Sequence, residues 1–194
     1  MKTILLLLLS GGLPSWLTAG NEPPHVPAVQ WSEAVNGLQA RLIVEARKEV
    51  LPGTMQPEIY LELHNVSEVN GTIDFDFEPY SFKPGFFDGT RKRAMGSVTT
   101  IMSGFANPSF RVALPRDGTM RFPLTWKGYG IGKGMGVMVC LENGLWNFAK
   151  DDKSEYYLCG SLVIEKGAPV GGIDRLWHGS LKVPAVKVPV SEKK

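Results

Sequence analysis

The two cysteines carry the most reactive side chains in the sequence. Cys140 and Cys159 are its only cysteines. A hairpin that pairs residues 137–142 with residues 156–165 would place the two sulfurs opposite each other, at a separation that permits a disulfide. Two buried free thiols are the alternative, whereas a metal or redox site would need neighbouring histidine ligands that the sequence does not offer. We therefore expect a structural role for both cysteines, and neither a metal nor a cofactor.

Three histidines are candidate general bases: His25, His64 and His178. None belongs to a nucleophile elbow, a zinc-binding helix motif or a cysteine–histidine pair of recognisable spacing. A hydrolase whose site is assembled from loops, with His64 or His178 as the base, is an alternative that requires a nucleophile or a metal within hydrogen-bonding reach. The glycine-rich residues 128–136 match neither the phosphate-loop nor the dinucleotide-binding spacing. The sequence thus favours a protein that is not an enzyme.

A set of aromatic and basic residues is the main candidate for binding. Three phenylalanines and two arginines crowd into one short segment, and a tryptophan lies in a second: Phe82, Phe86, Phe87, Arg91, Arg93 and Trp146. Exposed aromatic rings beside guanidinium groups suit stacking on carbohydrate or contact with a protein. The alternative is that the first segment folds back and anchors itself over an edge of the fold. Residues 81–107 alternate weakly, so the sequence leaves open whether they form a loop or edge strands.

Other conspicuous residues have structural interpretations. Asp74, Asp76 and Glu78 diverge along one strand, so we expect a solvated acidic face rather than a calcium site. Trp31 precedes the first strand, and we expect its ring to plug an end of the fold. Asn65 and Asn70 each begin an N-glycosylation sequon, which would be used only in a eukaryotic source.

The elements that must position these residues are short β-strands. Between residues 38 and 190 apolar and polar side chains alternate with a period of two, most cleanly around Ile73, Phe75 and Phe77. Asn-Gly, Asp-Gly and Pro-Gly pairs separate the alternating segments, as expected of turns. The pattern predicts an all-β fold, an antiparallel two-sheet sandwich of eight or nine strands. Helical signals are confined to single turns at residues 32–35 and 146–153.

The first twenty residues have the order of a secretory signal peptide. Lys2 gives a basic start, residues 4–9 are apolar, and a polar stretch leads to a small residue at Ala19, where we expect cleavage. The apolar run is much shorter than the ~20 residues that cross a bilayer, so we expect no retained membrane span. We expect a signal peptide at 1–19, an extended leader at 20–30, a β-sandwich domain at 31–190 and a tail at 191–194. The expected location is therefore the periplasm or the outside of the cell.

The charge balance limits the class of partner. The chain has 21 Lys and Arg against 19 Asp and Glu, a formal net charge of +2. This is too little for the phosphate-tracking surface of a nucleic-acid-binding protein. Hydrophobic residues make up 43% of the chain, which is enough for a packed core and rules out wholesale disorder.

Three motifs are spread over the predicted domain. Residues 31–40 (WSEAVNGLQA) have the pattern W-x-x-x-V-N-G-L-Q, residues 60–67 (YLELHNVS) form a predicted strand that ends in N-V-S, and residues 177–186 (WHGSLKVPAV) have the pattern W-x-G-x-L-x-x-P-x-V. These motifs resemble the opening, an inner strand and the closing strand of Ig-like β-sandwich domains in exported bacterial proteins. The resemblance implies an Ig-like fold and an accessory or interaction role, and it brings no catalytic residues. Arg41 departs from it, because such domains often have a small residue there.

These observations lead to one leading expectation and two alternatives. The chain is expected to be an exported, non-catalytic Ig-like domain that binds a protein or a cell-envelope polymer. The alternatives are the hydrolase with His64 or His178 and a proteinase inhibitor built on a sandwich scaffold. Neither the ligand nor the oligomeric state follows from the sequence.

Overall fold

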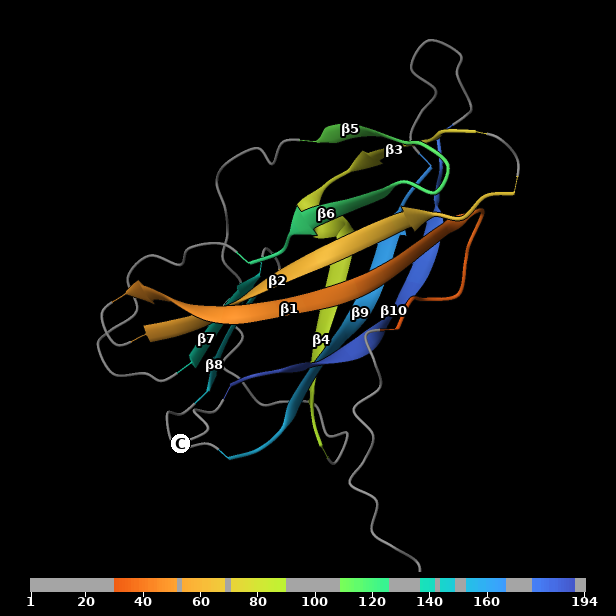
Figure 1. Cartoon of the computed structure of the whole chain (residues 1–194). Coiled ribbons are helices and arrows are strands. Elements are labelled where there is room, and N and C mark those ends of the chain that lie inside the picture. Colours follow the sequence, from red (N-terminus) through yellow and green to blue (C-terminus); the bar gives the residue numbers. More distant parts are fainter. Residues whose placement is uncertain are drawn as a thin grey trace, which may run out of the picture.

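The fold is almost entirely β. The computed structural model describes residues 30–51, 54–68, 71–89, 109–125, 137–141, 144–148, 153–166 and 176–190. Within these ranges it contains one 3₁₀ turn, η1 (Pro79–Ser81), and no α-helix (Figure 1). The ten strands are β1 (Leu38–Leu51), β2 (Thr54–Asn65), β3 (Ile73–Phe77), β4 (Phe82–Asp88), β5 (Phe110–Leu114), β6 (Thr119–Pro123), β7 (Val137–Leu141), β8 (Gly144–Phe148), β9 (Tyr156–Ile164) and β10 (Gly179–Val188).

The strands form three sheets. The large sheet has the order β1-β2-β7-β8, with β6 also paired to β2; the three-stranded sheet has the order β10-β9-β4; and β3 and β5 form a two-stranded ribbon. All pairings are antiparallel except the short one between β2 and β7. In Figure 1, β1 and β2 run in front of the three-stranded sheet, and the β3–β5 ribbon lies above them.

The all-β prediction is confirmed, but its details need correction. Ten strands in three sheets replace the expected eight or nine strands in two. Both expected helical turns are wrong: residues 32–35 lead into a hairpin, and Trp146 lies within strand β8. Trp146 pairs with Val139 of β7, so backbone hydrogen bonds across the hairpin took precedence over local helix signals.

The inward side chains of the sheets share one apolar core. It contains residues from every strand except β6, with Phe122 of β6 packed against it. Phe86 of the three-stranded sheet contacts Trp146 and Phe148 of the large sheet, with ring centroids 4.9 and 5.7 Å apart. Phe77 of the ribbon stacks on Phe122 at 4.0 Å. Aromatic packing therefore joins all three sheets.

The three sequence motifs meet at one corner of the molecule. Val35 and Leu38 exchange two backbone hydrogen bonds of 2.9 and 3.0 Å across Asn36 and Gly37, whose φ angles of 49° and 80° are those of a type I′ turn. The Gly37 carbonyl accepts a 2.7 Å hydrogen bond from the amide of residue 66. Trp177 Nε1 donates to the Val35 carbonyl at 2.9 Å. The motifs thus hold the start of β1, the end of β2 and the entry to β10 together.

Asn65 completes this corner. Its side chain is 0% exposed and its amide nitrogen donates to the carbonyls of Gly71 and Leu114, at 3.1 and 2.9 Å. Its amide oxygen accepts from the backbone nitrogen and the hydroxyl of Ser67, at 3.0 and 2.7 Å. An asparagine held in this way has no room for a glycan, so the sequon at Asn65 is not a modification site in this fold.

In the described ranges, no helix has the length and the apolar character that crossing a membrane requires.

Candidate functional site

The aromatic residues expected to bind a partner are mostly in the core. Phe82 and Phe86 are 2% exposed and Trp146 is 6% exposed, so these three expectations need correction. The segment that holds the two phenylalanines is an edge strand, β4, paired with β9. Its alternation turns Phe82 and Phe86 inward, and only Phe87 lies on the outer side, half-buried. Arg91 and Arg93 lie outside the described residues.

The cysteines are free thiols that lie in different sheets. β7 forms its hairpin with β8, and β9 pairs with β10 and β4, so the register that suggested a disulfide does not occur. Cys140 is buried in the large sheet, and Cys159 is half-buried on the outer side of the three-stranded sheet. Burial raises the pKa of the Cys159 thiol, which makes it less reactive at neutral pH.

The histidines have no catalytic surroundings in the part of the chain that the structure describes. His64 contacts the ring of Trp31, with centroids 5.2 Å apart. The Nδ1 atom of exposed His178 lies 3.2 Å from the carbonyl oxygen of Leu176. Among the described residues no hydrogen bond joins either imidazole to a nucleophile, and no group of three metal-binding side chains occurs. The hydrolase alternative therefore gains no support from this part of the molecule.

A different surface holds the most organised polar cluster among the described residues. The outward side chains of β1, β2 and β6 form it, and we call it the arginine face. Their registers align three rows across the strands: Gln39, His64 and Thr119; Arg41, Glu62 and Arg121; and Ile43, Tyr60 and Pro123. Local alternation turns these residues outward, whereas their neighbours Leu42, Leu61 and Leu63 enter the core.

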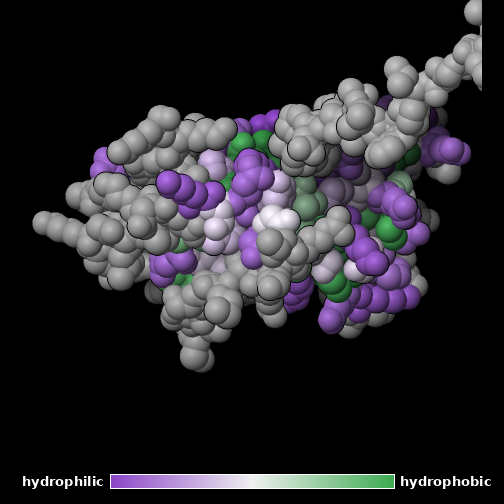
Figure 2. Space-filling view, turned by 90° about the horizontal axis from the view of Figure 1, so that it is seen from below, coloured by the Kyte–Doolittle hydropathy of each residue, from purple (hydrophilic) through white to green (hydrophobic). Residues whose placement is uncertain are grey.

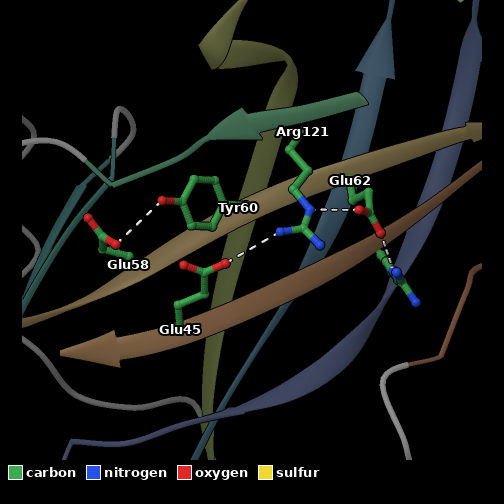
Figure 3. Close-up of polar contacts among 6 residues, drawn as sticks. Glu45, Glu58, Tyr60, Glu62 and Arg121 are labelled. Carbon is green, nitrogen blue, oxygen red and sulfur yellow. Dashed lines mark hydrogen bonds and ion pairs between the residues drawn. The ribbon is translucent and has the colours of Figure 1, made fainter. Parts of the chain in front are cut away.

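Glu62 is the centre of the arginine face. Arg41 Nε donates to its Oε2 atom at 2.5 Å, and Arg121 Nε donates to its Oε1 atom at 2.7 Å. Arg121 also reaches Glu45 through Nη1, at 3.4 Å, and Tyr60 donates its hydroxyl to Glu58, at 3.4 Å (Figure 3). Glu62 is only 4% exposed although it lies on the outer side of the sheet. Two charge-assisted hydrogen bonds compensate the burial of its charge.

The surroundings of Glu62 keep it ionised. Burial alone would raise the pKa of its carboxyl, but the hydrogen bonds from Arg121 and Arg41 outweigh that effect and hold the pKa below its ordinary value. The hydrogen bond to Glu62 also raises the pKa of Arg121. Near neutral pH Glu62 and Arg121 therefore keep their charges, so the cluster is suited to holding side chains in place and binding rather than to transferring protons.

Trp31 covers one side of this cluster. The Cζ atom of Arg41 lies 4.2 Å from the centroid of its ring, in a cation–π contact. The arm that carries Trp31 is fixed to β1, because the Ser32 amide donates to the Ala40 carbonyl at 2.8 Å and the Ala40 amide donates to the Ser32 hydroxyl at 3.0 Å. The expectation that Trp31 plugs an end of the fold is therefore wrong, since its ring lies against outward-facing Arg41 and His64.

Sequence reasoning missed most of this surface. In the sequence Arg41 marks only a departure from a motif, and no local pattern singles out Tyr60, Glu62 or Arg121. A signal was present, because residues 41 and 62 have opposite charges in the outward phase of two alternating segments. The sequence does not show that β6 pairs with β2, and this pairing brings residue 121 opposite Glu62.

Comparison with protein-family models, with curated proteins and with solved structures found no match for this chain. The geometry of the surfaces is therefore the guide to function. Large exposed hydrophobic side chains are few in the described residues, namely Phe110 and Met120. On the side seen in Figure 2, the coloured surface is mainly hydrophilic, with small separate hydrophobic areas.

Proposed function

We propose that this chain is an exported, non-catalytic interaction domain with an Ig-like arrangement of its packed sheets, and that it contacts a partner protein through the arginine face. The observation that carries the proposal is the fixed array of Trp31, Arg41, Glu62 and Arg121 on an outward-facing surface. The N-terminal sequence pattern supports export, and the three motifs support the Ig-like arrangement.

The composition of the arginine face fits protein recognition. Tryptophan, tyrosine and arginine are the residue types that most often dominate the binding energy of protein interfaces. The face offers Trp31, Tyr60 and Arg121 beside half-buried Ile43, with both signs of charge close together. Mixed charges favour one orientation of a complementary partner and oppose others.

The hydrogen-bond network lowers the cost of binding. Ordering a long side chain at an interface costs about 0.5–1.5 kcal/mol. Arg41 and Arg121 are already held through their Nε atoms, and in the described structure the Nη groups of Arg41 have no hydrogen-bond acceptor. These N–H groups can donate to a carboxylate or carbonyl of a partner without disturbing Glu62.

Photo-crosslinking in the source cell tests the proposal. The probe is p-benzoylphenylalanine in place of Ile43, which lies opposite Tyr60 in an outer row of the arginine face, and the control carries the same probe in place of exposed Ala113 on β5. We expect one dominant adduct from position 43 and none of that mass from position 113. Arg121→Lys keeps the charge but loses the Nε contact, and we expect it to weaken the adduct band.

Two results would contradict the proposal. One is an identical adduct pattern from positions 43 and 113, and the other is an adduct from position 43 that is unchanged by Arg121→Lys. An adduct of twice the chain mass would show that this surface joins two copies of the chain rather than a different protein.

A further inference from the structure

The outer side of the three-stranded sheet carries a second surface that is independent of the arginine face. We propose that this surface, which we call the lysine face, binds an anionic polysaccharide. It consists of the outward residues Lys83, Phe87, Tyr157, Ser161 and Lys182.

The register of the sheet arranges the lysine face in rows. Lys83 of β4 lies opposite Ser161 of β9, which lies opposite Lys182 of β10. Further along the same side, Phe87 lies opposite Tyr157. The two rows are four positions apart along β9, about 13 Å at the rise of a β-strand. The surface therefore has a row of two ammonium groups and a hydroxyl at one end and two aromatic rings at the other.

The row between the lysine end and the aromatic end has small side chains. It contains Gly85 and Cys159, and beside Cys159 the strand β10 has a bulge that contains Pro184 and Ala185. A Cβ atom at Gly85 would lie only 3.3 Å from Cε2 of Phe87, so the Phe87 ring extends over this glycine. Small side chains in this row leave a path along β9 from the aromatic rings to the lysines.

Among the described residues, no acidic side chain pairs with the two lysines of the lysine face. Lys187, next to Tyr157, forms an ion pair with Glu155, which also accepts a hydrogen bond from the Tyr157 hydroxyl at 3.1 Å. Lys83 and Lys182 are exposed, and neither forms an ion pair with any residue in the described ranges. Two uncompensated cations beside a hydroxyl complement carboxylate or sulfate groups.

The aromatic rings favour a polysaccharide over other polyanions. Phe87 and Tyr157 are half-buried, so they offer ring surface for stacking without forming a large apolar patch. A lipid surface would require deeper apolar insertion, and the most exposed large hydrophobic side chains, Phe110 and Met120, lie on β5 and β6. The low net charge of the chain argues against a nucleic acid.

Binding of defined polymers to the whole protein tests the proposal. The probes are dextran sulfate, polygalacturonate, neutral dextran, polyphosphate and vesicles of phosphatidylglycerol, measured by calorimetry at two salt concentrations. We expect binding to dextran sulfate or polygalacturonate, weaker at high salt, and none to neutral dextran. The preference between the first two identifies the acidic group.

Variants assign the binding to the lysine face. Lys83→Gln with Lys182→Gln should weaken binding about tenfold, because two exposed ion pairs are lost. Phe87→Ala should weaken binding without changing its salt dependence. Arg111→Gln with Arg116→Gln removes the same charge from the ribbon and the turn after it, and this control should bind as the wild type does. Thermal unfolding should show that all the variants fold.

Several results would overturn the proposal. One is that the control pair weakens binding as much as the two lysine substitutions do, and another is that neutral dextran binds as well as the anionic polysaccharides. A third is that neither anionic polysaccharide binds, and a fourth is that polyphosphate or vesicles bind and Phe87→Ala does not change their binding. Failure of the arginine face to bind a protein leaves this test unaffected, because the two surfaces share no residue.

Discussion

Replacing Asn65 by alanine tests whether the corner formed by the three motifs depends on one buried amide. Asn65 makes four hydrogen bonds, to Gly71, Leu114 and two atoms of Ser67, from a site that is 0% exposed. Each lost hydrogen bond costs about 1 kcal/mol, and a buried carbonyl left without a donor adds to this. We expect Asn65→Ala to lower the free energy of unfolding by about 3–4 kcal/mol.

The measurement is urea and thermal unfolding followed by tryptophan fluorescence. For a domain of this size 1 kcal/mol corresponds to about 2–4 °C in Tm, so Tm should fall by about 10 °C. Asn147→Ala is the matched control, because in the described structure the Oδ1 atom of Asn147 is buried without a hydrogen-bond partner. We expect its cost to stay below about 1 kcal/mol. Equal costs for the two variants would refute the assignment of the corner to Asn65.

Three further predictions follow from particular contacts. Glu62→Gln should lower the free energy of unfolding by about 2 kcal/mol at pH 7. Because the pKa of Glu62 is lowered in the folded state, the difference in stability between wild type and variant should be constant above about pH 5 and shrink below about pH 4. A difference that does not depend on pH would contradict this. Gly37→Ala should cost about 2 kcal/mol in urea unfolding, since its φ is +80° and the new Cβ would lie 2.8 Å from a side chain, whereas Gly89→Ala, with no atom within 4 Å, should cost little. Iodoacetamide should label both Cys140 and Cys159 after unfolding without a reductant, as mass spectrometry will show, whereas a disulfide would leave both unlabelled.

The candidate site was only partly accessible to sequence reasoning. Phe82 and Phe86 lie beside Pro84 and Gly85, a pair typical of turns, so the sequence left open whether the segment forms a loop or an edge strand. In the structure Pro84 lies in strand β4, where proline is tolerated because one side of the strand has no partner among the described strands. Once the segment is a strand, its alternation turns both phenylalanines into the core and Phe87 outward.

The cysteines show the same limit. Their spacing allowed a hairpin between two segments that are both strands in the structure. The nearer segment at residues 144–148 pairs with β7 instead, while β9 is held by β4 and β10. A pattern of period two marks which segments are strands, but every strand offers the same hydrogen-bonding groups to every other.

The amino-acid sequence alone determined the β-class of this protein, the turn at Asp117 and Gly118 and the face to which many side chains point, because alternation and turn geometry are local properties of the chain. Only the tertiary structure decided which strands are neighbours. Arg41, Glu62 and Arg121 are brought together by pairings between distant segments, as are Lys83, Ser161 and Lys182. Such pairings depend on how the whole apolar core packs, so both proposed surfaces exist only in the folded chain.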